Sequence, residues 1–293
     1  MFYRRKIILS VLELINKPVE KIQLQKLLFL VSKRIEKSPY DFIPYKFGCY
    51  SFSLKADLDT MTRKKQLEEV DNFYLLEEKT DFLSSLRSED TDSIKKTVST
   101  FGGMDKNELI KYTYRNYPFY ASRSSIADEI LNQNEYKKIL KTKTSQNNTT
   151  LFTIGYEGIS LEKYLLKLIE NNVKLLVDVR KNPISMKFGF NKSKLKWVCN
   201  SLGIDYLHLP EVGIESNKRT HLNRQEDYEI LFDDYKTSVL AKTVKIQQQI
   251  LQLLKQNNRI ALTCFEAETS KCHRTHLANA VSSLSNTSYH LKH

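Results

Sequence analysis

Residues 259–281 read RIALTCFEAETSKCHRTHLANAV and join a short apolar run, a polar loop and a helical repeat. The run 259–262 predicts a buried strand, because it is apolar and is closed by turn-prone polar residues. Residues 276–281 place their apolar side chains at helical spacing. A strand, a loop and a helix in this order are typical of an α/β domain with a parallel sheet.

The loop between this strand and this helix carries side chains that can do chemistry. The thiol of Cys264 and the carboxylate of Glu266 lie where the strand ends. Cys272, His273 and Arg274 open the next helix, where free N–H groups and the helix dipole favour an anion. Chemistry in open α/β sheets usually takes place at this edge. We therefore interpret the stretch as an active-site loop.

The whole second half of the chain alternates strands with helices, which is typical of a parallel sheet. The further predicted strands are 151–154, 174–180, 204–209 and 288–291. The predicted helices between them are 160–170, 192–202, 226–239 and 243–256. The sequence thus predicts a Rossmann-like, mostly parallel α/β domain over residues 151–293.

The first half of the chain is helical in its apolar spacing. The predicted helices there are 7–15, 24–35 and 52–65. Ser51 or Ser53 is the expected N-cap of the third helix. Residues 67–78 are expected to form a short hairpin, and further short helices follow. Three helices and a hairpin are the order of a winged helix, so we expect a helical, winged-helix-like domain over residues 1–133.

A polar stretch separates the two halves. Residues 138–150 lose helical periodicity, so we expect a linker over residues 134–150. A length of 293 residues is consistent with two domains.

The charge of the chain indicates its class of partner. The formal net charge is +12 and the isoelectric point is about 9.3. Such an excess of basic residues favours polyanions, with nucleic acid ahead of an anionic membrane surface. We expect DNA, modified or foreign, rather than RNA, and no membrane partner.

Cysteine usage and apolar runs indicate the compartment. The cysteines are few and scattered, at Cys49, Cys199, Cys264 and Cys272, unlike a secreted disulfide framework. The N-terminal residues resemble a signal peptide only superficially, because Glu13 interrupts the apolar run. No run is apolar and long enough to span a bilayer. A reduced, cytoplasmic protein is the expectation.

Part of the first half resembles a known module. Residues 23–30, QLQKLLFL, are followed by residues 42–48, FIPYKFG, and then by Tyr50 and Ser51. This pattern is similar to a helical, winged-helix-like module of prokaryotic regulatory and antitoxin-associated proteins, and to Panacea-type domains. Cys49 replaces the proline that usually follows the glycine. The resemblance implies binding of DNA or of another protein, and the alternative is that the aromatic residues only pack a core.

In the second half, the predicted strand ends bring reactive side chains to one edge of the sheet. The candidate catalytic residues are Tyr156, Asp178, His208, Cys264 and Glu266. The candidate substrate-binding residues are Gly155, Arg180, Lys187, Phe190, Glu211, Cys272, His273 and Arg274. We expect these side chains to form one functional site.

The same strand ends resemble a family. The motifs are TIGY at 153–156, VDVR at 177–180, YLHLPE at 206–211, and Cys264-x-Glu266 followed by Cys-His-Arg at 272–274. They resemble the prokaryotic domain-of-unknown-function family four hundred and eighty-eight over residues 151–291. The resemblance implies a compact α/β domain, often encoded fused to or beside DNA-related modules, and it implies no particular reaction.

The leading hypothesis from these residues is a hydrolase that cleaves a glycosidic or phosphoester bond of nucleic acid. Asp178 or Glu266 would activate water, and Arg180 and Arg274 would hold phosphate. Lysines of residues 181–196 would follow the backbone, with Phe188 or Phe190 stacking on a base.

Other hypotheses remain open. Cys264 could be the nucleophile of a sulfurtransferase or phosphatase-like enzyme, and Val177–Arg180 faintly resembles rhodanese domains. A non-enzymatic DNA-binding regulator with a nucleotide-sensing α/β domain is a further alternative. Zinc could be held by Cys264, Cys272 and His273 with His208 or Glu266. The spacing is not a standard one and adjacent Cys and His rarely both ligate, so we expect no metal and no other cofactor.

Overall fold

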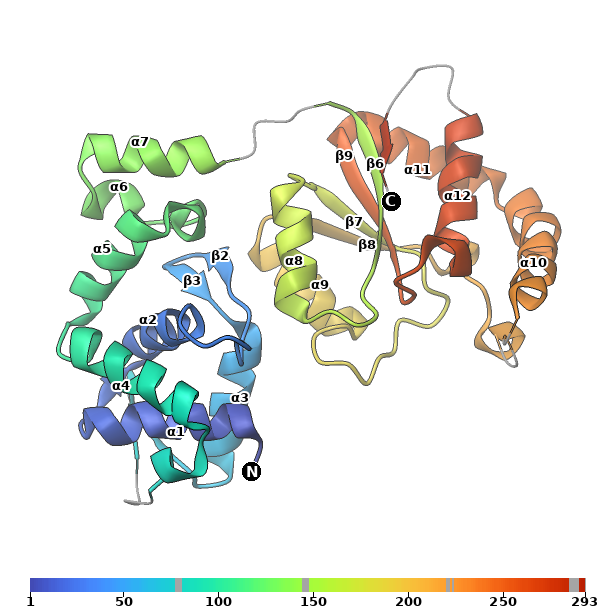
Figure 1. Cartoon of the computed structure of the whole chain (residues 1–293). Coiled ribbons are helices and arrows are strands. Elements are labelled where there is room, and N and C mark those ends of the chain that lie inside the picture. Colours follow the sequence, from blue (N-terminus) through green and yellow to red (C-terminus); the bar gives the residue numbers. More distant parts are fainter. Residues whose placement is uncertain (77–80, 144–147, 220–221, 223, 285–289, 293) are drawn as a thin grey trace. The chain divides into compact units, whose positions relative to one another are not determined.

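A computed structural model shows that the chain forms two compact units, Met1–Lys143 and Thr144–His293 (Figure 1). The structure describes residues 1–76, 81–143, 148–219, 222, 224–284 and 290–292. Each unit has a buried hydrophobic core of its own. Within the described part of the chain, no helix combines the length and the apolar character needed to cross a membrane.

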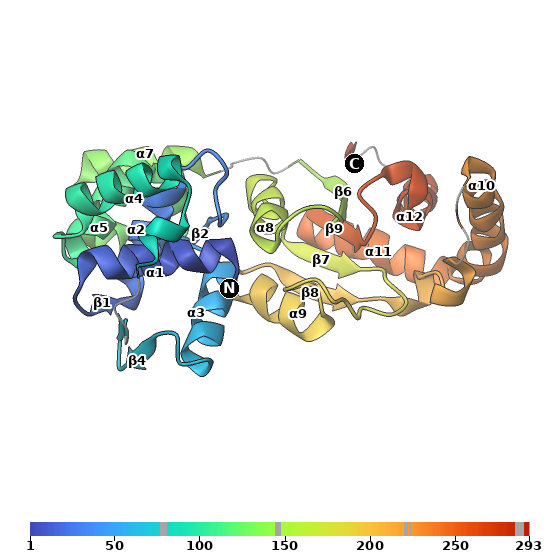
Figure 2. The ribbon, with the colours of Figure 1, turned by 60° about the horizontal axis from the view of Figure 1, so that its bottom comes forward.

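The first unit begins with the elements predicted for a winged helix. They are α1 (Tyr3–Ile15), β1 (Val19–Glu20), α2 (Lys21–Ser32), β2 (Ile43–Tyr45), β3 (Gly48–Tyr50), α3 (Phe52–Arg63), β4 (Glu68–Val70) and β5 (Phe73–Leu75). Strands β1, β5 and β4 pair in that order in an antiparallel sheet. The order of these elements is the one expected of a winged-helix-like unit, with the hairpin β2–β3 inserted between α2 and α3. The hairpin β4–β5 projects from the helices (Figure 2).

The local sequence explains where α3 begins. Ser51 has an extended backbone, and its Oγ accepts a hydrogen bond of 3.2 Å from the backbone N–H of Leu54. Ser51 is therefore the N-cap, one of the two serines predicted. The backbone of Ser51 also bonds the side-chain amide of Gln25 in α2, so the cap ties two helices together.

The aromatic stretch that precedes α3 is mostly core. Tyr40 and Phe42 are buried, and Phe42 packs edge-on against Phe29 at 5.3 Å between ring centroids. The rings of Tyr45 and Tyr50 contact each other across the hairpin β2–β3. Core packing accounts for this part of the pattern.

The linker prediction was too long. The first unit continues through α4 (Ser88–Phe101), α5 (Lys106–Asn116), α6 (Ala127–Ile130) and α7 (Gln133–Thr142). Helix α7 covers the first part of the predicted linker 134–150, and the boundary between the units follows Lys143. Asn132 and Glu135 form a capping box that starts α7, and Ile139 is buried in the core. One buried apolar residue suffices because neighbouring helices cover it, so periodicity alone did not reveal the helix.

The second unit is the predicted α/β domain. Its strands are β6 (Thr150–Gly155), β7 (Leu175–Asp178), β8 (Asp205–His208), β9 (Arg259–Cys264) and β10 (His290–Lys292). All pair in parallel in the order β10-β6-β9-β7-β8. Strand β9 therefore lies between β6 and β7, in the centre of the sheet, and the loop of residues 265–272 follows this central strand.

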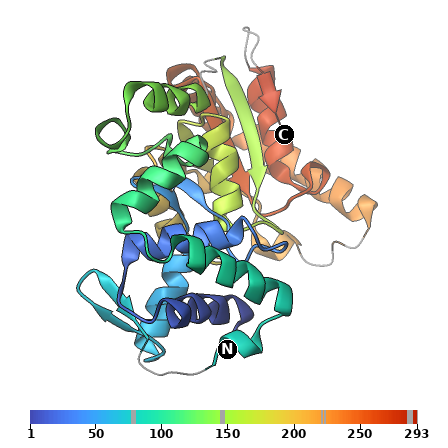
Figure 3. The ribbon, with the colours of Figure 1, turned by 60° about the vertical axis from the view of Figure 1, so that its left-hand side comes forward.

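Helices cover both faces of this sheet (Figure 1). They are α8 (Leu161–Glu170), α9 (Lys192–Ser201), α11 (Val244–Asn257) and α12 (His273–Ser283). Helix α10 (Gln225–Asp234) packs against α12, where the ring centroids of Phe232 and His276 lie 4.4 Å apart. Helix α12 lies beside β6 and β9 (Figure 3). On the opposite face, the hydroxyl of Tyr164 in α8 donates to Thr263 Oγ1 of β9 at 2.8 Å.

Strand alternation assigns each residue of the central strands to one face. Ile260, Leu262 and Cys264 of β9 share a core cluster with α11 and α12. Thr263 points to α8 instead. In β7, Leu175 and Val177 belong to the α11–α12 cluster, so the next residue, Asp178, points to the face of α8 and α9.

The N-cap of α3 generates a first prediction. Ser51→Ala should lower the free energy of unfolding of the first unit by about 1 kcal/mol, because an orphan N–H of α3 loses its acceptor. Urea unfolding followed by far-UV circular dichroism measures this change. The only tryptophan, Trp197, lies in the second unit, so its fluorescence transition should stay in place. Ser99→Ala on exposed α4 is the control, and equal effects of the two substitutions would contradict the assigned cap.

Candidate functional site

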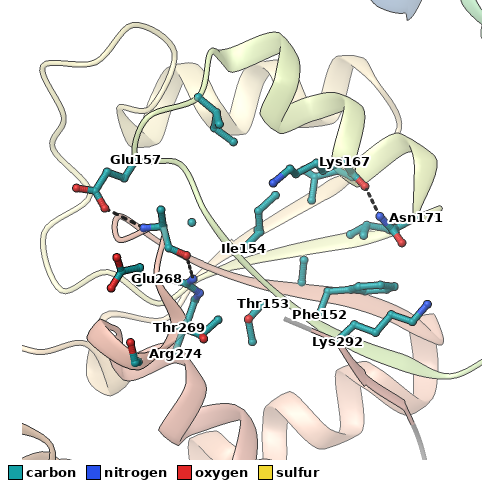
Figure 4. A pocket seen from close by; sticks show the side chains of 17 residues that line it. Phe152, Thr153, Ile154, Glu157, Lys167, Asn171, Glu268, Thr269, Arg274 and Lys292 are labelled. Carbon is teal, nitrogen blue, oxygen red and sulfur yellow. Dashed lines mark hydrogen bonds between the residues drawn. The ribbon is translucent and has the colours of Figure 1, made fainter. Parts of the chain in front are cut away.

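The loop after β9 is held by backbone contacts from three directions. The N–H groups of Tyr156 and Glu157 donate to the carbonyl of Phe265 at 3.0 and 2.9 Å. Arg274 donates to the carbonyls of Glu266 and Ala267 at 2.5 and 3.1 Å. The carboxylate of Glu157 accepts from the N–H of Ala267 at 2.9 Å (Figure 4). The loop is thus a fixed platform between the end of β6 and the start of α12.

A glycine allows the end of β6 to approach this loop. A Cβ placed on Gly155 would lie 1.8 Å from the carbonyl oxygen of Glu266. Every other residue type carries a Cβ, so only glycine fits here without moving the loop. The predicted site residue Gly155 therefore positions the backbone of Glu266.

The carboxylate of Glu266 is the centre of a polar cluster. The Sγ atoms of Cys264 and Cys272 lie 3.1 and 3.0 Å from Glu266 Oε2. Arg219 forms an ion pair with Glu266 Oε1. The cluster combines two thiols, a carboxylate and a guanidinium group, and both cysteines are buried.

His273 completes the cluster in a defined tautomer. Its Nε2 lies 3.1 Å from the carbonyl oxygen of Val179, and its Nδ1 lies 2.7 Å from Arg219 Nη2. A carbonyl oxygen only accepts and a guanidinium group only donates. These contacts fit the tautomer that carries a proton on Nε2 and turns Nδ1 toward Arg219 and the thiols. Nδ1 is 3.7 Å from Cys264 Sγ and 4.0 Å from Cys272 Sγ.

The environment makes the two thiols unequal. Burial raises the pKa of Cys264, but the hydrogen bond from Cys272, the neighbouring His273 and the charge of Arg219 outweigh burial and hold this pKa well below the ordinary value. Burial and the adjacent Cys264 raise the pKa of Cys272 well above its ordinary value. Cys264 is thus the more acidic thiol of the pair.

A cavity of about 360 Å³ opens onto the cluster. Cys264, Glu266, His273 and Arg219 line one part of it. The other polar lining residues are Arg180, Lys181, Asn182, Ser185 and Ser216, and Tyr156, Ile184, Ile214 and Phe265 supply the apolar and aromatic surface. Convergent polar groups beside apolar and aromatic surface in one cavity are typical of a binding site for an organic molecule.

A second network lies at the same edge but on the opposite face of the sheet. Asp178 is fully buried and accepts from Arg180 Nε and Nη2 at 2.8 and 2.5 Å and from the Tyr206 hydroxyl at 2.6 Å. Arg180 also donates to the Tyr156 hydroxyl and to the carbonyl of Phe190, at 2.8 and 2.9 Å. Both charged groups are saturated with partners, so this network stabilises the edge.

Several predicted roles therefore need correction. Asp178 is sealed in its ion pair and is not placed to activate water. Phe190 is fully buried and stacks on Tyr156 at 4.1 Å between centroids, so it is not available to stack on a base. Arg180 and Arg274 donate hydrogen bonds to the carbonyls of Phe190 and Glu266 and not to phosphate. Core packing uses these side chains, which a sequence pattern does not reveal.

Other predicted residues lie apart from the thiols. Nε2 of His208 lies 2.8 Å from the carbonyl of Arg180, and its Nδ1 lies 3.0 Å from Lys192 Nζ. Lys187 donates to the carbonyl of Tyr156 at 2.7 Å, and Glu211 is exposed in a short 3₁₀ turn. The predicted residues that the fold brings together in the polar cluster are Cys264, Glu266, Cys272 and His273, and the predicted residues Tyr156 and Arg180 line the same cavity.

The comparison with known families concerns this unit. Residues 160–281 match the family described as "Domain of unknown function DUF488". The C-terminal unit contains a DUF488 domain. No curated protein matches the chain. The match confirms the resemblance seen in the strand-end motifs, and it does not extend to the winged-helix unit.

Arg219 is a residue of the DUF488 site that sequence reasoning missed. It lies in a 3₁₀ turn, Ser216–Arg219, far from any strand end, and yet it contacts both Glu266 and His273. The only signal in the sequence is a basic pair, Lys218-Arg219, in a polar stretch. Because the chain has 46 lysines and arginines, such a pair does not distinguish a site residue from a surface residue.

The close approach at Gly155 generates a second prediction. Gly155→Ala should displace the Glu266 backbone and lower the free energy of unfolding of the DUF488 domain by about 1–3 kcal/mol, because the added Cβ overlaps a carbonyl. Urea unfolding followed by Trp197 fluorescence measures it. Gly103→Ala in the first unit, where a Cβ meets nothing within 4 Å, is the control for the substitution itself, and its unfolding is followed by far-UV circular dichroism. An unchanged Gly155→Ala protein would contradict the close approach.

The buried ion pair generates a third prediction. Asp178→Asn should lower the free energy of unfolding of the second unit by about 3–5 kcal/mol, because it leaves the Arg180 charge buried without its counter-charge. Tyr206→Phe removes only one hydrogen bond to the carboxylate and should cost about 1.5–3 kcal/mol. Trp197 fluorescence in urea measures both. An Asp178→Asn protein as stable as the parent would show that the pair is not structural.

Proposed function

We propose that the protein is a hydrolase that acts on nucleic acid, DNA in preference to RNA, at the cavity beside Glu266. The observation that carries the proposal is a cavity that combines a polar cluster with aromatic and aliphatic side chains. Glu266, Cys264 and Arg219 face the same cavity as Phe265 and Ile184. Such a cavity suits an unstacked base, which enzymes read by stacking and by hydrogen bonds to its edge.

The surface of α9 supports a polyanionic substrate. Lys192, Lys196 and Trp197 are exposed on this helix, and Lys194 Nζ lies 4.3 Å from the centroid of the Trp197 ring. The loop that leads into α9 contributes the exposed ring of Phe188. Positive charge beside exposed aromatic rings is typical of surfaces that bind single-stranded nucleic acid. Phe188 and Trp197 take the stacking role predicted for Phe190.

Glu266 is the residue best placed for the chemistry. Its carboxylate faces the cavity and would take a proton from the water that attacks a glycosidic or phosphoester bond. Arg219 binds the other carboxylate oxygen and would stabilise negative charge that develops on the leaving group. Glu266 thus takes over the part that the sequence also offered to Asp178.

The first unit is a poor match to DNA despite its winged-helix connectivity. The hairpin β4–β5 carries Glu68, Glu69 and Asp71, and carboxylates repel the phosphates that a wing would contact. On α3, Lys55 is paired with Asp59. We therefore assign nucleic-acid contact to the DUF488 domain and assign the first unit to a protein partner.

A cysteine-dependent enzyme is the second candidate. The observation that favours it is the position of Cys264 at the end of the central strand, with its Sγ in the same cavity. In that mechanism Cys264 would attack the substrate, as in sulfurtransferases and phosphatases. Glu266 would then be dispensable for the attack.

The fourth prediction separates these candidates. Glu266→Gln should lower turnover of the labelled nucleic acid by about 10²–10⁴-fold, because water loses its proton acceptor. Binding and its salt dependence should persist, since they arise from basic residues elsewhere. The substrates are single- and double-stranded DNA, plain and base-modified, and RNA, followed for base or strand release. Glu268→Gln, with the same change two residues away, is the matched control.

Each other result has a defined meaning. Full activity of Glu266→Gln would exclude the carboxylate mechanism, and loss in Cys264→Ser alone would favour the thiol. Salt-dependent binding without any release would identify a non-enzymatic regulator. Equal loss in Glu266→Gln and Glu268→Gln would point to the charge of the loop and not to a specific base.

A further inference from the structure

We propose that Cys264, Cys272 and His273 hold a zinc ion and that Glu266 lies beside the fourth coordination position. This inference deepens the proposed function and rests on it for the reaction, but the metal site itself rests on geometry alone. The donor atoms of the three residues all lie within 4.8 Å of one another. All three residues are buried.

The spacing of the donor atoms matches a metal coordination sphere. Zinc binds sulfur at about 2.3 Å and imidazole nitrogen at about 2.0–2.1 Å, which in a tetrahedron places sulfur and nitrogen about 3.6 Å apart. The observed separations of His273 Nδ1 from the two Sγ atoms are 3.7 and 4.0 Å. Glu266 Oε2 is 3.1 and 3.0 Å from the same sulfurs. The two nitrogen–sulfur separations exceed the tetrahedral value by only a few tenths of an ångström.

The backbone explains how adjacent residues can share one ion. Cys272 is the N-cap of α12 and has an extended backbone, whereas His273 is the first helical residue. Because the backbone changes conformation between these two residues, Cys272 Sγ and His273 Nδ1 lie 4.0 Å apart. This local geometry answers the objection that neighbouring Cys and His rarely both ligate.

The histidine already has the hydrogen bond of a metal ligand. A ligating imidazole usually donates its other N–H to a carbonyl or carboxylate, which fixes the tautomer. His273 donates Nε2–H to the Val179 carbonyl and turns its Nδ1 lone pair to the thiols. Arg219 now holds that lone pair at 2.7 Å, so metal binding requires Arg219 Nη2 to leave Nδ1. Arg219 would keep its contact with Glu266 Oε1 and orient the carboxylate from outside.

The donor set selects the metal. Two thiolates and an imidazole suit zinc and not magnesium, calcium or manganese, which prefer oxygen. Binding would release the two thiol protons to solvent, and the charges of the thiolates and the ion would cancel. Three protein ligands with a fourth position facing a cavity are typical of a catalytic zinc site. A zinc-bound water there would lie beside Glu266, which would take its proton.

The fifth prediction is the metal content of the full-length protein, prepared without a polyhistidine tag from cells grown with added zinc. We expect about one zinc ion per chain. Cys264→Ser, Cys272→Ser and His273→Ala should each lower the zinc content by more than about tenfold. Glu266→Gln should keep the ion, because it leaves the three protein ligands in place. Cys199→Ala, a buried cysteine of α9, is the matched control and should keep it too.

Cobalt gives a readout that does not depend on mutants or activity. Addition of Co²⁺ to the reduced, metal-free parent protein should produce a thiolate-to-cobalt charge-transfer band and raise the temperature of unfolding. If a ligand variant does not fold, the cobalt spectrum of the parent protein still tests the metal site. Zinc-free protein without a cobalt band, zinc retained in all three ligand variants, or a Cys264–Cys272 disulfide in freshly reduced protein would each overturn the site.

The two proposals fail separately. Stoichiometric zinc in a protein that hydrolyses no nucleic acid would support the metal site and overturn the hydrolase. Hydrolysis by protein that contains no metal would support the hydrolase and overturn the metal site.

Discussion

The alternation of side chains along the two central strands is the constraint on which the site depends. Consecutive residues of a strand point to opposite faces of the sheet. Cys264 follows Thr263 on β9, and Asp178 follows Val177 on β7, so the thiol and the carboxylate end on different faces. One edge of the sheet therefore carries two polar networks. A one-residue shift of either strand would move its polar side chain to the other face and would bring the thiol and the carboxylate to the same face.

The two polar networks at this edge of the sheet differ in their access to a ligand. On the face of α8 and α9, Asp178, Arg180 and Tyr206 form a sealed ion pair with its hydrogen bonds. A buried pair of this kind fixes geometry more than it adds stability, because desolvation offsets most of the attraction. On the face of α12, Glu266 gathers thiols and Arg219 next to a cavity. The first network holds Tyr156 in the wall of that cavity, and the second is open to a ligand.

The loop after β9 owes its precision to backbone contacts. Gly155, the N–H groups of the following residues and the guanidinium of Arg274 all act on the backbone of residues 265–267. These contacts hold the loop through its backbone. The side chains of Cys264 and Glu266 are therefore not needed to hold the loop, and their spacing from Cys272 and His273 is set by the same contacts.

The sequence by itself determined the elements and their class. The apolar runs at 151–154 and 259–262 and the helical spacing between strands predicted the α/β unit, because local periodicity records which side of an element is buried. The cluster of Cys264, Glu266, Cys272 and His273 was also within reach, since all four lie in one loop and one helix start. Only the tertiary structure decided that β9 lies between β6 and β7, that Asp178 faces away from the thiols, and that Arg219 reaches the site. Strand order and long-range pairing depend on which surfaces pack together, and no short window of sequence contains that information.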